Sequence, residues 1–273
     1  MTLVVKIGGA AGIGGEALLD DLARHGDDLV VVHGGSDETT RLQERLGRPA
    51  EFLTSPSGHV SRRTDRETLE AFAMATALVN RRLVEGLLAR RRTALGLSGL
   101  DGRLLEGPRK GAVRTVENGR VRVLRDEWTG RPERADGDLL GCLLGRGLVP
   151  VVAPLAASPK GEMLNVDGDR AAACLATGLG AATLLILTNV PGLLRDPEDA
   201  TSLITHVPLV DLEEAAGFAQ GRMKKKVLGA REALEGGVER VILADARREA
   251  PLTDALHGLG TVIGAPLAGE VHA

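Results

Sequence analysis

Short runs of β-branched and aliphatic residues alternate along this chain with longer amphipathic stretches. The short runs predict strands at 3–7, 28–33, 93–97, 148–154, 182–188 and 238–244. The stretches between them repeat apolar residues at helical spacing, and predict helices at about 15–25, 36–47, 64–91, 136–146, 168–179 and 223–236. This βαβ rhythm predicts an α/β fold whose mostly parallel sheet is covered by helices on both faces.

The composition excludes several classes of protein. The 273 residues suffice for one large or two modest domains, and the net charge of −3 argues against general binding to nucleic acid or membrane surfaces. Three Phe, one Trp and no Tyr leave little for stacking on bases. Cys142 and Cys174 lie in apolar helical contexts without metal-ligand spacing, which predicts buried thiols in a reducing compartment. No stretch resembles a signal peptide or a membrane span, so we expect a cytoplasmic protein.

One segment breaks the βαβ rhythm. Residues 112–125 alternate apolar and polar side chains around Asn118-Gly119, which is a strong signal for a β-hairpin. A hairpin that projects from an α/β sheet either shapes a substrate pocket or only decorates the sheet edge, and the sequence leaves both interpretations open.

Glycine-containing turns follow predicted strands or open a helix, where open α/β sheets bind ligands. There are four: KIGG (6–9), HGGSDET (33–39), TNVPGLL (188–194) and GRMKKK (221–226). In the second, Gly34 and Gly35 lead into Ser36, which we expect to cap the helix that follows. Backbone amides at such a helix start can hold phosphate oxygens. One such turn alone is more often only a turn, but the four together predict a phosphate site.

The lysines agree with this prediction. Of 34 basic residues only six are lysines, namely Lys6, Lys110, Lys160 and the run Lys224, Lys225 and Lys226. The run is either a solvated face or an anion site, and cations at a helix N-terminus oppose the helix dipole unless an anion is bound. Because the glycines follow Lys6, the order excludes a Walker A loop, and GGAAGIGG (8–15) lacks the dinucleotide-binding spacing.

Acids and an amide cluster before the predicted helix at 168–179. Asp167 is the better N-cap candidate, and Asp169 lies in the first turn. Asp169 either complements the helix dipole or holds two lysines in position toward a transferring phosphoryl group. Upstream, GHVSRRTDRET (58–68) supplies arginine forks, which bind carboxylates bidentately and suit an acidic substrate.

Seven motifs together resemble the amino acid kinases of the acetylglutamate kinase type: VVKIGGA, VVHGGSDET, FLTSPSGHVSRRTDRETLE, GLSGLDGRL, NVDGD, LTNVPGLL and GRMKKKVLGA. Within that family the chain is most similar to the branch that phosphorylates aminoadipate held on a small, acidic, LysW-type amino-group carrier protein in lysine biosynthesis. The resemblance implies a three-layer fold with substrate-side β-hairpins, an acidic-substrate lobe over residues 1–180 and an ATP-binding lobe over 181–273. It also implies ATP with Mg²⁺ and a homodimer.

The resemblance further implies roles for individual residues. The catalytic set is Lys6, Asp169 and Lys226, and the substrate-binding set is Gly34, Gly35, Arg62 and Asn165. The ATP-binding set is Gly8, Gly9, Thr188, Asn189, Gly192, Met223 and Lys224. Acetylglutamate kinases usually show Gly-Gly-Met, a two-residue gap and then the lysine. Here Arg222 replaces the second glycine and Lys224-Lys225 fill the gap, so the sequence leaves open which lysine of the run is catalytic.

Five cations are placed around the predicted pocket mouth, namely Arg63, Arg66, Arg103, Arg109 and Lys110. They are either ordinary solvated charge or a basic rim that steers the acidic carrier. Two other functions stay open. The acceptor is free N-acetylglutamate in the first, and in the second the chain is a catalytically silent module that senses a nucleotide or an amino acid. A silent sensor has no need of Lys6, Asp169 and Lys226, all of which are present.

Overall fold

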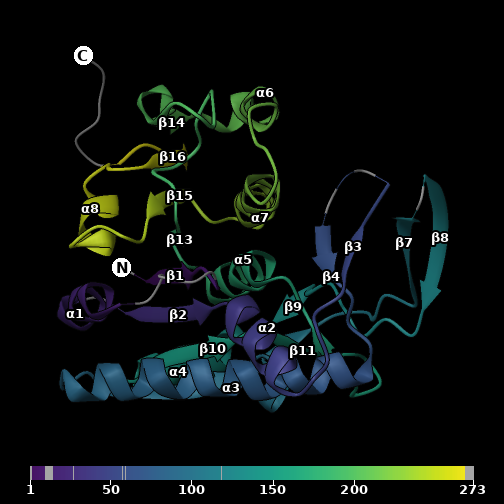
Figure 1. Cartoon of the computed structure of the whole chain (residues 1–273). Coiled ribbons are helices and arrows are strands. Elements are labelled where there is room, and N and C mark those ends of the chain that lie inside the picture. Colours follow the sequence, from purple (N-terminus) through teal and green to yellow (C-terminus); the bar gives the residue numbers. More distant parts are fainter. Residues whose placement is uncertain are drawn as a thin grey trace.

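An eight-stranded sheet forms the centre of the computed structural model, which describes residues 2–9, 15–26, 28–56, 58, 60–117 and 119–267 (Figure 1). Its strand order is β14-β16-β15-β13-β1-β2-β10-β5. The strands are β1 (Leu3–Ile7), β2 (Leu29–His33), β5 (Ala94–Ser98), β10 (Val149–Ala153), β13 (Thr183–Thr188), β14 (His206–Val207), β15 (Arg240–Asp245) and β16 (Thr261–Gly264). Paired neighbours run parallel except β15 and β16. The six predicted strands and the mostly parallel sheet are therefore confirmed.

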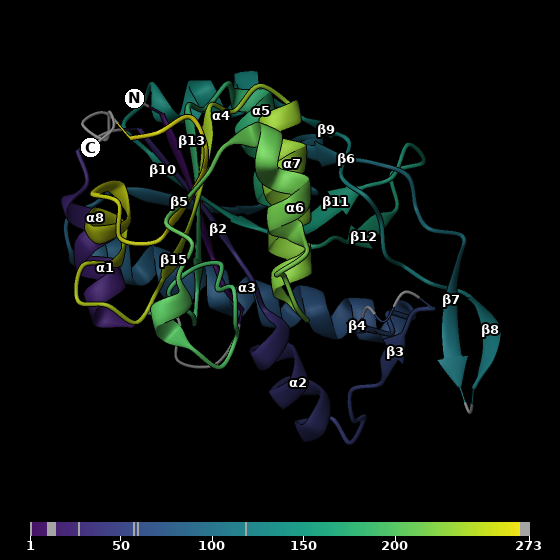
Figure 2. The same cartoon turned by 90° about the horizontal axis from the view of Figure 1, so that it is seen from above.

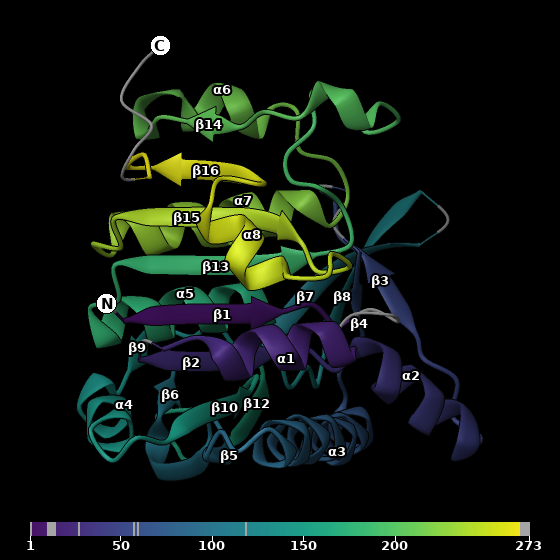
Figure 3. The ribbon, with the colours of Figure 1, turned by 90° about the vertical axis from the view of Figure 1, so that its left-hand side faces the viewer.

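Helices cover both faces of this sheet, as predicted. They are α1 (Glu16–Arg24), α2 (Ser36–Arg45), α3 (Arg66–Ala89), α4 (Gly137–Leu144), α5 (Gly168–Leu179), α6 (Leu212–Ala216), α7 (Met223–Glu235) and α8 (Pro251–Leu256). Alternate residues of β1 enter two separate cores, because successive side chains of a strand point to opposite faces. Val4 packs with α4, α5 and α7, whereas Val5 packs with α1, α3 and α8. Figure 3 shows β1 near the middle of the sheet, so its carboxyl end is central.

Smaller β elements extend from one side of the sheet. A four-stranded sheet has the order β12-β11-β6-β9. Its strands are β6 (Leu105–Glu106), β9 (Arg134–Ala135), β11 (Leu155–Ala157) and β12 (Met163–Asn165). Two hairpins project beyond it, β3 (Phe52–Thr54) with β4 (Val60–Arg62) and β7 (Ala112–Glu117) with β8 (Arg120–Arg125) (Figure 2). The second is the predicted hairpin, although its turn residue Asn118 lies outside the described residues, as do residues 10–14 of GGAAGIGG.

The helix starts agree with the sequence in part. Asp167 caps α5, accepting hydrogen bonds from the amides of Asp169 and Arg170. The predicted capping role of Ser36 is wrong, because Ser36 is already the first residue of α2 and Gly35 precedes it without a side-chain cap. Within the described residues, no helix is both long and apolar enough to cross a membrane.

The prediction of two buried thiols is also wrong. Cys142 is exposed, because the apolar stripe of α4 that faces the core runs through Leu140 and Leu144 instead. Cys174 of α5 is part-exposed, and burial raises the pKa of its thiol to about 11. Both cysteines are free thiols.

The central sheet is continuous across residue 180, since β13 pairs with all five residues of β1. The strands on the two sides of that residue therefore contribute to the same two cores rather than forming separate bodies. The division into an acid lobe and an ATP lobe stays a prediction.

Candidate active site

Two glycine loops leave the carboxyl ends of β1 and β2 and touch backbone to backbone. A Cβ atom on Gly9 would lie 2.7 Å from the amide nitrogen of Gly35, and one on Gly34 would lie 2.6 Å from Cα of Gly9. Any larger residue would therefore push the loops apart. The Gly34 amide donates to the carbonyl of Ile7 at 3.0 Å, which holds the second loop on the first. The glycines predicted for nucleotide and for substrate thus lie in one continuous cradle.

Three charged side chains meet beside this cradle. Lys6 Nζ of β1 lies 2.6 Å from Asp169 Oδ1, and Lys226 Nζ lies 3.1 Å from Asp169 Oδ2. All three residues are less than a tenth exposed, at 6%, 6% and 9% in the order Lys6, Asp169 and Lys226. Lys225 Nζ instead lies 3.8 Å from Asp167 Oδ2, and Lys224 is exposed. Among the lysines of the run, the geometry therefore favours Lys226 as the partner of Lys6 and Asp169.

The electrostatics of this cluster suit an anion. Burial on its own would raise the pKa of Asp169, but the charges of Lys6 and Lys226 outweigh it and hold that pKa well below its usual range. Burial lowers the pKa of Lys226, and the charge of Lys6 lowers it further while Asp169 opposes the change. Two ammonium groups share one carboxylate, so the buried cluster has an excess of positive charge.

The residues predicted to bind the acidic substrate are linked through Thr64. Asn165 donates from Nδ2 to Thr64 Oγ1 at 3.1 Å, and Thr64 Oγ1 donates to the carbonyl of Arg62 at 3.3 Å. Asn165 ends β12 only four residues before Asp169. A Cβ on Gly168 would lie 3.4 Å from Cε of Lys6, so the chain runs directly from the amide of Asn165 to the lysine cluster.

Arg62 is held in place by neutral acceptors. Its guanidinium donates to the side chains of Gln43 at 2.5 Å and Thr40 at 2.8 Å, and to the carbonyl of Ser36 at 2.9 Å. It also lies over the ring of Phe52, 5.1 Å from the ring centre. Burial lowers the pKa of Arg62. Within the described residues no carboxylate pairs with it, so a fixed cation faces the cradle without a protein counter-ion.

His33 and Asn80 support the second glycine loop, although sequence motifs had assigned no role to either residue. Burial lowers the pKa of His33 to about 4; the carbonyl of Gly34 opposes this, and Lys6 adds to it. The neutral ring contacts the Gly34 carbonyl through Nδ1 at 2.9 Å, and Asn80 donates to Nε2 at 3.2 Å. Asn80 also donates to the carbonyl of Val151 at 2.7 Å. The one signal in the sequence that could have indicated this support was Asn80, a polar residue within the amphipathic helix α3.

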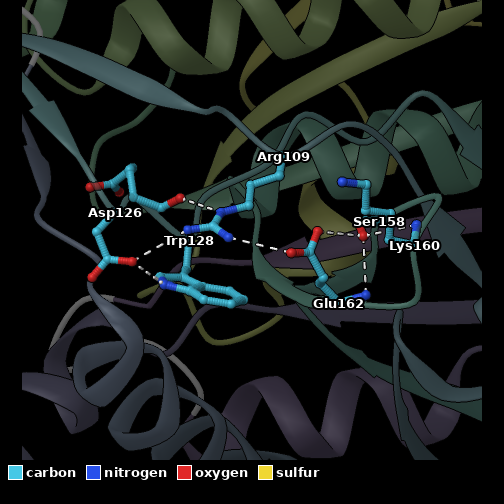
Figure 4. Close-up of polar contacts among 7 residues, drawn as sticks. Arg109, Asp126, Trp128, Ser158, Lys160 and Glu162 are labelled. Carbon is cyan, nitrogen blue, oxygen red and sulfur yellow. Dashed lines mark hydrogen bonds and ion pairs between the residues drawn. The ribbon is translucent and has the colours of Figure 1, made fainter.

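Arg109 braces the segment that carries Asn165 rather than lying free at the pocket mouth. Its Cζ atom lies 3.6 Å from the centre of the Trp128 ring. Its guanidinium lies 3.5 Å from Asp126 Oδ1 and 3.3 Å from Glu162 Oε1, and Figure 4 shows it between these two side chains. The amide of Asn165 donates to the carbonyl of Trp128 at 2.9 Å. The buried carboxylate of Glu127 accepts from the amide of Thr64 at 3.2 Å, and burial raises the pKa of Glu127.

Three other arginines of the predicted rim also have acidic partners. Arg63 pairs with Glu51, Arg66 with Glu70 and Arg103 with Glu106. Lys110 differs from them, because it is exposed and takes part in no ion pair among the described residues. Binding of the carrier by this rim stays a prediction, and four of its five cations already pair with nearby carboxylates.

Apart from Gly8 and Gly9, the residues predicted to bind ATP lie at or after the carboxyl end of β13 and at the start of α7. Thr188 is buried and its hydroxyl lies 3.5 Å from the amide oxygen of Asn189. A Cβ on Gly192 would lie 2.5 Å from Thr261 Oγ1, so this glycine is required by packing on β16. Met223 opens α7, the helix whose first turn brings Lys226 to Asp169.

Comparison with known proteins identifies the family to which a site of this geometry belongs. The sequence model of the Amino acid kinase family matches residues 1–245. The chain is 54% identical over 265 residues to a LysW-aminoadipate kinase of Deinococcus radiodurans, covering 96% of this chain and 91% of that protein. It is 52% identical over 267 residues to a LysW-aminoadipate kinase of Thermus thermophilus, covering 96% and 99%. Among solved structures, N-acetylglutamate synthase from Neisseria gonorrhoeae with coenzyme A and N-acetylglutamate superposes with a TM-score of 0.78, at 26% identity, covering 100% of this chain and 62% of that one.

Proposed function

Since the chain belongs to the amino acid kinase family, and is thus an ATP-using phosphotransferase, we propose that its acceptor is the side-chain carboxylate of 2-aminoadipate. The aminoadipate is attached through its α-amino group to a LysW-type carrier protein, and the product is an acyl phosphate in lysine biosynthesis. The names of two relatives more than half identical support this acceptor. The observation that carries the chemistry is the buried cluster of Lys6, Asp169 and Lys226 beside the glycine cradle.

The reaction requires no general base. A side-chain carboxylate with an ordinary pKa of about 4 is ionised at neutral pH, and one of its oxygens attacks the γ-phosphorus of ATP. The new oxygen–phosphorus bond forms as the bond to the β,γ-bridging oxygen breaks, and ADP leaves with that electron pair. Mg²⁺ carried with the nucleotide neutralises phosphate charge. The protein contributes alignment and further positive charge along the line of transfer.

We assign these contributions to the clustered side chains. Lys6 and Lys226 lie on opposite oxygens of Asp169, so they act as two fixed ammonium donors for the oxygens of the transferred group. Asp169 keeps them in place without donating to the reaction itself. We assign the backbone amides of Gly8, Gly9 and Gly35 to phosphate oxygens, because the loops have no side chains in the way, whereas the Gly34 amide already donates to the carbonyl of Ile7.

Arg62 and Asn165 hold the acidic substrate in this proposal. A guanidinium fixed by three neutral acceptors can receive a carboxylate without first breaking an ion pair. The ATP side is assigned to residues 181–273 through Thr188, Asn189, Gly192, Met223 and Lys224, and the acid side to residues 1–180. Transfer then takes place between the two lobes, beside Asp169.

We also propose a homodimer. The outer face of α3 exposes Met74, Leu78 and Leu88 at 54%, 44% and 50%. It lies along β5, which is an edge strand of the central sheet and exposes Leu95 at 40%. Apolar side chains of this size, gathered beside an unpaired strand edge, favour a contact between two copies of the chain. Size-exclusion chromatography with light scattering tests this, and a monomer of 28.6 kDa would contradict it.

Trapping of the product tests the proposed reaction. The protein is incubated with ATP, Mg²⁺ and hydroxylamine, and with either carrier-linked aminoadipate, free N-acetylglutamate or no acceptor. Hydroxylamine converts an acyl phosphate into a coloured hydroxamate. We expect hydroxamate with the carrier-linked acid and little with the other two. Hydroxamate from the free acid alone would assign the chain to arginine biosynthesis, and none from either acid would contradict the kinase.

Recognition of the acidic carrier predicts a strong salt dependence. Besides Lys110, the projecting β7–β8 hairpin exposes Arg114, Arg120 and Arg125, and within the described residues none of the four forms an ion pair. Such charges act on the association rate and are screened by salt. We expect kcat/KM with the carrier-linked acid to fall steeply from low to physiological salt, and replacement of Lys110, Arg114 and Arg125 by alanine to flatten that fall at nearly unchanged kcat.

Two controls accompany the salt series. Figure 2 shows α4 away from the β7–β8 hairpin, and the exposed Arg146 lies two residues after α4, so Arg146→Ala should keep the full salt dependence. Arg109→Ala serves as a contrast, because removing the stack on Trp128 should disturb Asn165 and lower kcat itself. Equal efficiency with the free acid, or a carrier reaction indifferent to salt, would contradict the proposed partner.

A further inference from the structure

The helices that bring Asp169 and Lys226 together pack at small residues. A Cβ on Gly229 of α7 would lie 3.3 Å from the backbone carbonyl of Asp169 on α5. A Cβ on Gly236, just after α7, would lie 2.2 Å from Thr177 Oγ1. These glycines let the two helices approach closely. Small residues do little, however, to stop one helix from sliding along the other, because they offer no interlocking side chains.

An arginine fork spans the same interface. Arg170 follows Asp169 on α5, and it donates from Nε to Glu232 Oε2 at 2.8 Å and from Nη2 to Glu232 Oε1 at 2.5 Å. The side chains of Arg170 and Glu232 are only 16% and 21% exposed. Arg131, from the segment between β8 and β9, adds a contact to Glu232 Oε1 at 3.2 Å. A bidentate pair of this kind fixes direction as well as distance, which the glycines do not.

We propose that the Arg170–Glu232 pair is a positioning clamp, which determines the position of the Lys226 ammonium group relative to the Asp169 carboxylate. Arg170 and Asp169 are consecutive on α5, and Glu232 and Lys226 belong to the same rigid helix α7. A shift of Glu232 along Arg170 therefore moves the ammonium of Lys226 away from the carboxylate of Asp169. The inference rests on the proposed function, in which Lys226 acts on the transferred phosphoryl group.

The surrounding charges make Glu232 necessary for this arrangement. Arg170 and Arg131 both contact Glu232 Oε1, at 2.5 and 3.2 Å, so two guanidinium groups lie close together and share this one carboxylate. Without the carboxylate of Glu232, Arg170 would be repelled by its neighbours and free to compete for Asp167 or Asp169. Either movement would disturb the lysine cluster. Glu232 thus holds the guanidinium on the α7 side of the interface.

Glu232→Gln tests the clamp, because it keeps the size of the side chain and removes its charge. Misplacement of a catalytic group by about 1 Å can cost about a hundred-fold in rate, so we expect kcat to fall about ten- to a hundred-fold. The KM for ATP should change less than kcat, because Thr188, Asn189 and Gly192 of the assigned ATP set do not lie on α7. Glu235→Gln is the matched control, because Glu235 lies exposed on the same helix and forms no ion pair among the described residues. It should retain the activity of the unmodified enzyme.

Adding Arg170→Gln to Glu232→Gln should lower kcat little further, because both substitutions remove the same pair. A Glu232→Gln enzyme with unchanged kcat would overturn the clamp, even if its melting temperature falls. Crystal structures of the Glu232→Gln variant and of the unmodified enzyme give a second readout, which does not depend on measuring activity. The clamp requires that Lys226 Nζ move away from Asp169 in the variant, and an unchanged ion pair would refute it. Absence of hydroxamate from the unmodified enzyme would instead contradict the proposed function alone.

Discussion

Lys226→Ala is expected to lower kcat about a hundred- to a thousand-fold while ATP binding changes far less. The reason is that its ammonium would act mainly on charge that develops in the transition state, and removal of one such donor typically has this cost. The same loss is expected for Lys6→Ala, since both lysines contact the carboxylate of Asp169. Turnover is measured as hydroxamate released, and ATP affinity by calorimetry on the same preparations.

Lys225→Ala provides the control for that result. Lys225 Nζ lies 3.8 Å from Asp167 and is part-exposed, so we expect its removal to leave kcat close to that of the unmodified enzyme. An inactive Lys225→Ala enzyme beside an active Lys226→Ala enzyme would show that the wrong lysine of the run has been assigned.

Asp169→Asn is expected to have the second large effect, on stability as well as on turnover. The substitution leaves two buried ammonium groups beside a neutral amide, and loss of one member of a buried ion pair costs about 3–5 kcal/mol. The pKa of Asp169 is held below its usual range in the folded protein, so its ionised form stabilises the fold above the unfolded pKa of about 4. This contribution is lost as the pH falls toward the folded value. Urea unfolding should therefore show a large difference from the unmodified protein at neutral pH and a smaller one in acid.

Two further variants make the Asp169 result specific. Adding Lys226→Met to Asp169→Asn removes one unpaired cation, so part of the stability should return while the activity does not. Asp138→Asn removes an exposed acid from the first turn of α4 and should change neither quantity. An active and equally stable Asp169→Asn enzyme would reduce Asp169 to a favourable charge at a helix N-terminus.

The motif resemblance was needed to bring Lys6 and Asp169 together. Lys6 is the penultimate residue of β1 in the central sheet, whereas Asp169 follows β12, which belongs to the smaller sheet and pairs antiparallel with β11, so no simple rule about strand ends joins them. The three lysines of the run could not be separated by that resemblance. They are consecutive on α7, so each points about 100° from the next, and only the packing of α7 on α5 decides that Lys226 turns inward.

Sequence patterns could not predict the contacts between segments that are distant along the chain. Arg63 and Arg109 of the predicted rim pair with Glu51, Asp126 and Glu162, which lie 12 or more residues away, and no periodicity or spacing predicts such pairs. The support of Gly34 by His33 and Asn80 was missed for the same reason. The short strand β14 carries too few residues for a period to be seen, and β16 was not predicted because glycines bound its short apolar run.

The fate of the acceptor oxygen tests the proposed reaction most directly. Aminoadipate labelled with heavy oxygen in its side-chain carboxylate is attached to the carrier and incubated with the enzyme, ATP, Mg²⁺ and hydroxylamine. If the carboxylate attacks the γ-phosphorus, attack of hydroxylamine on the acyl carbon releases phosphate that carries one heavy oxygen, together with the carrier hydroxamate. We predict labelled phosphate in equal amount to the hydroxamate. Unlabelled phosphate with intact labelled carboxylate would show that ATP is cleaved without transfer to the acid, and would contradict the account.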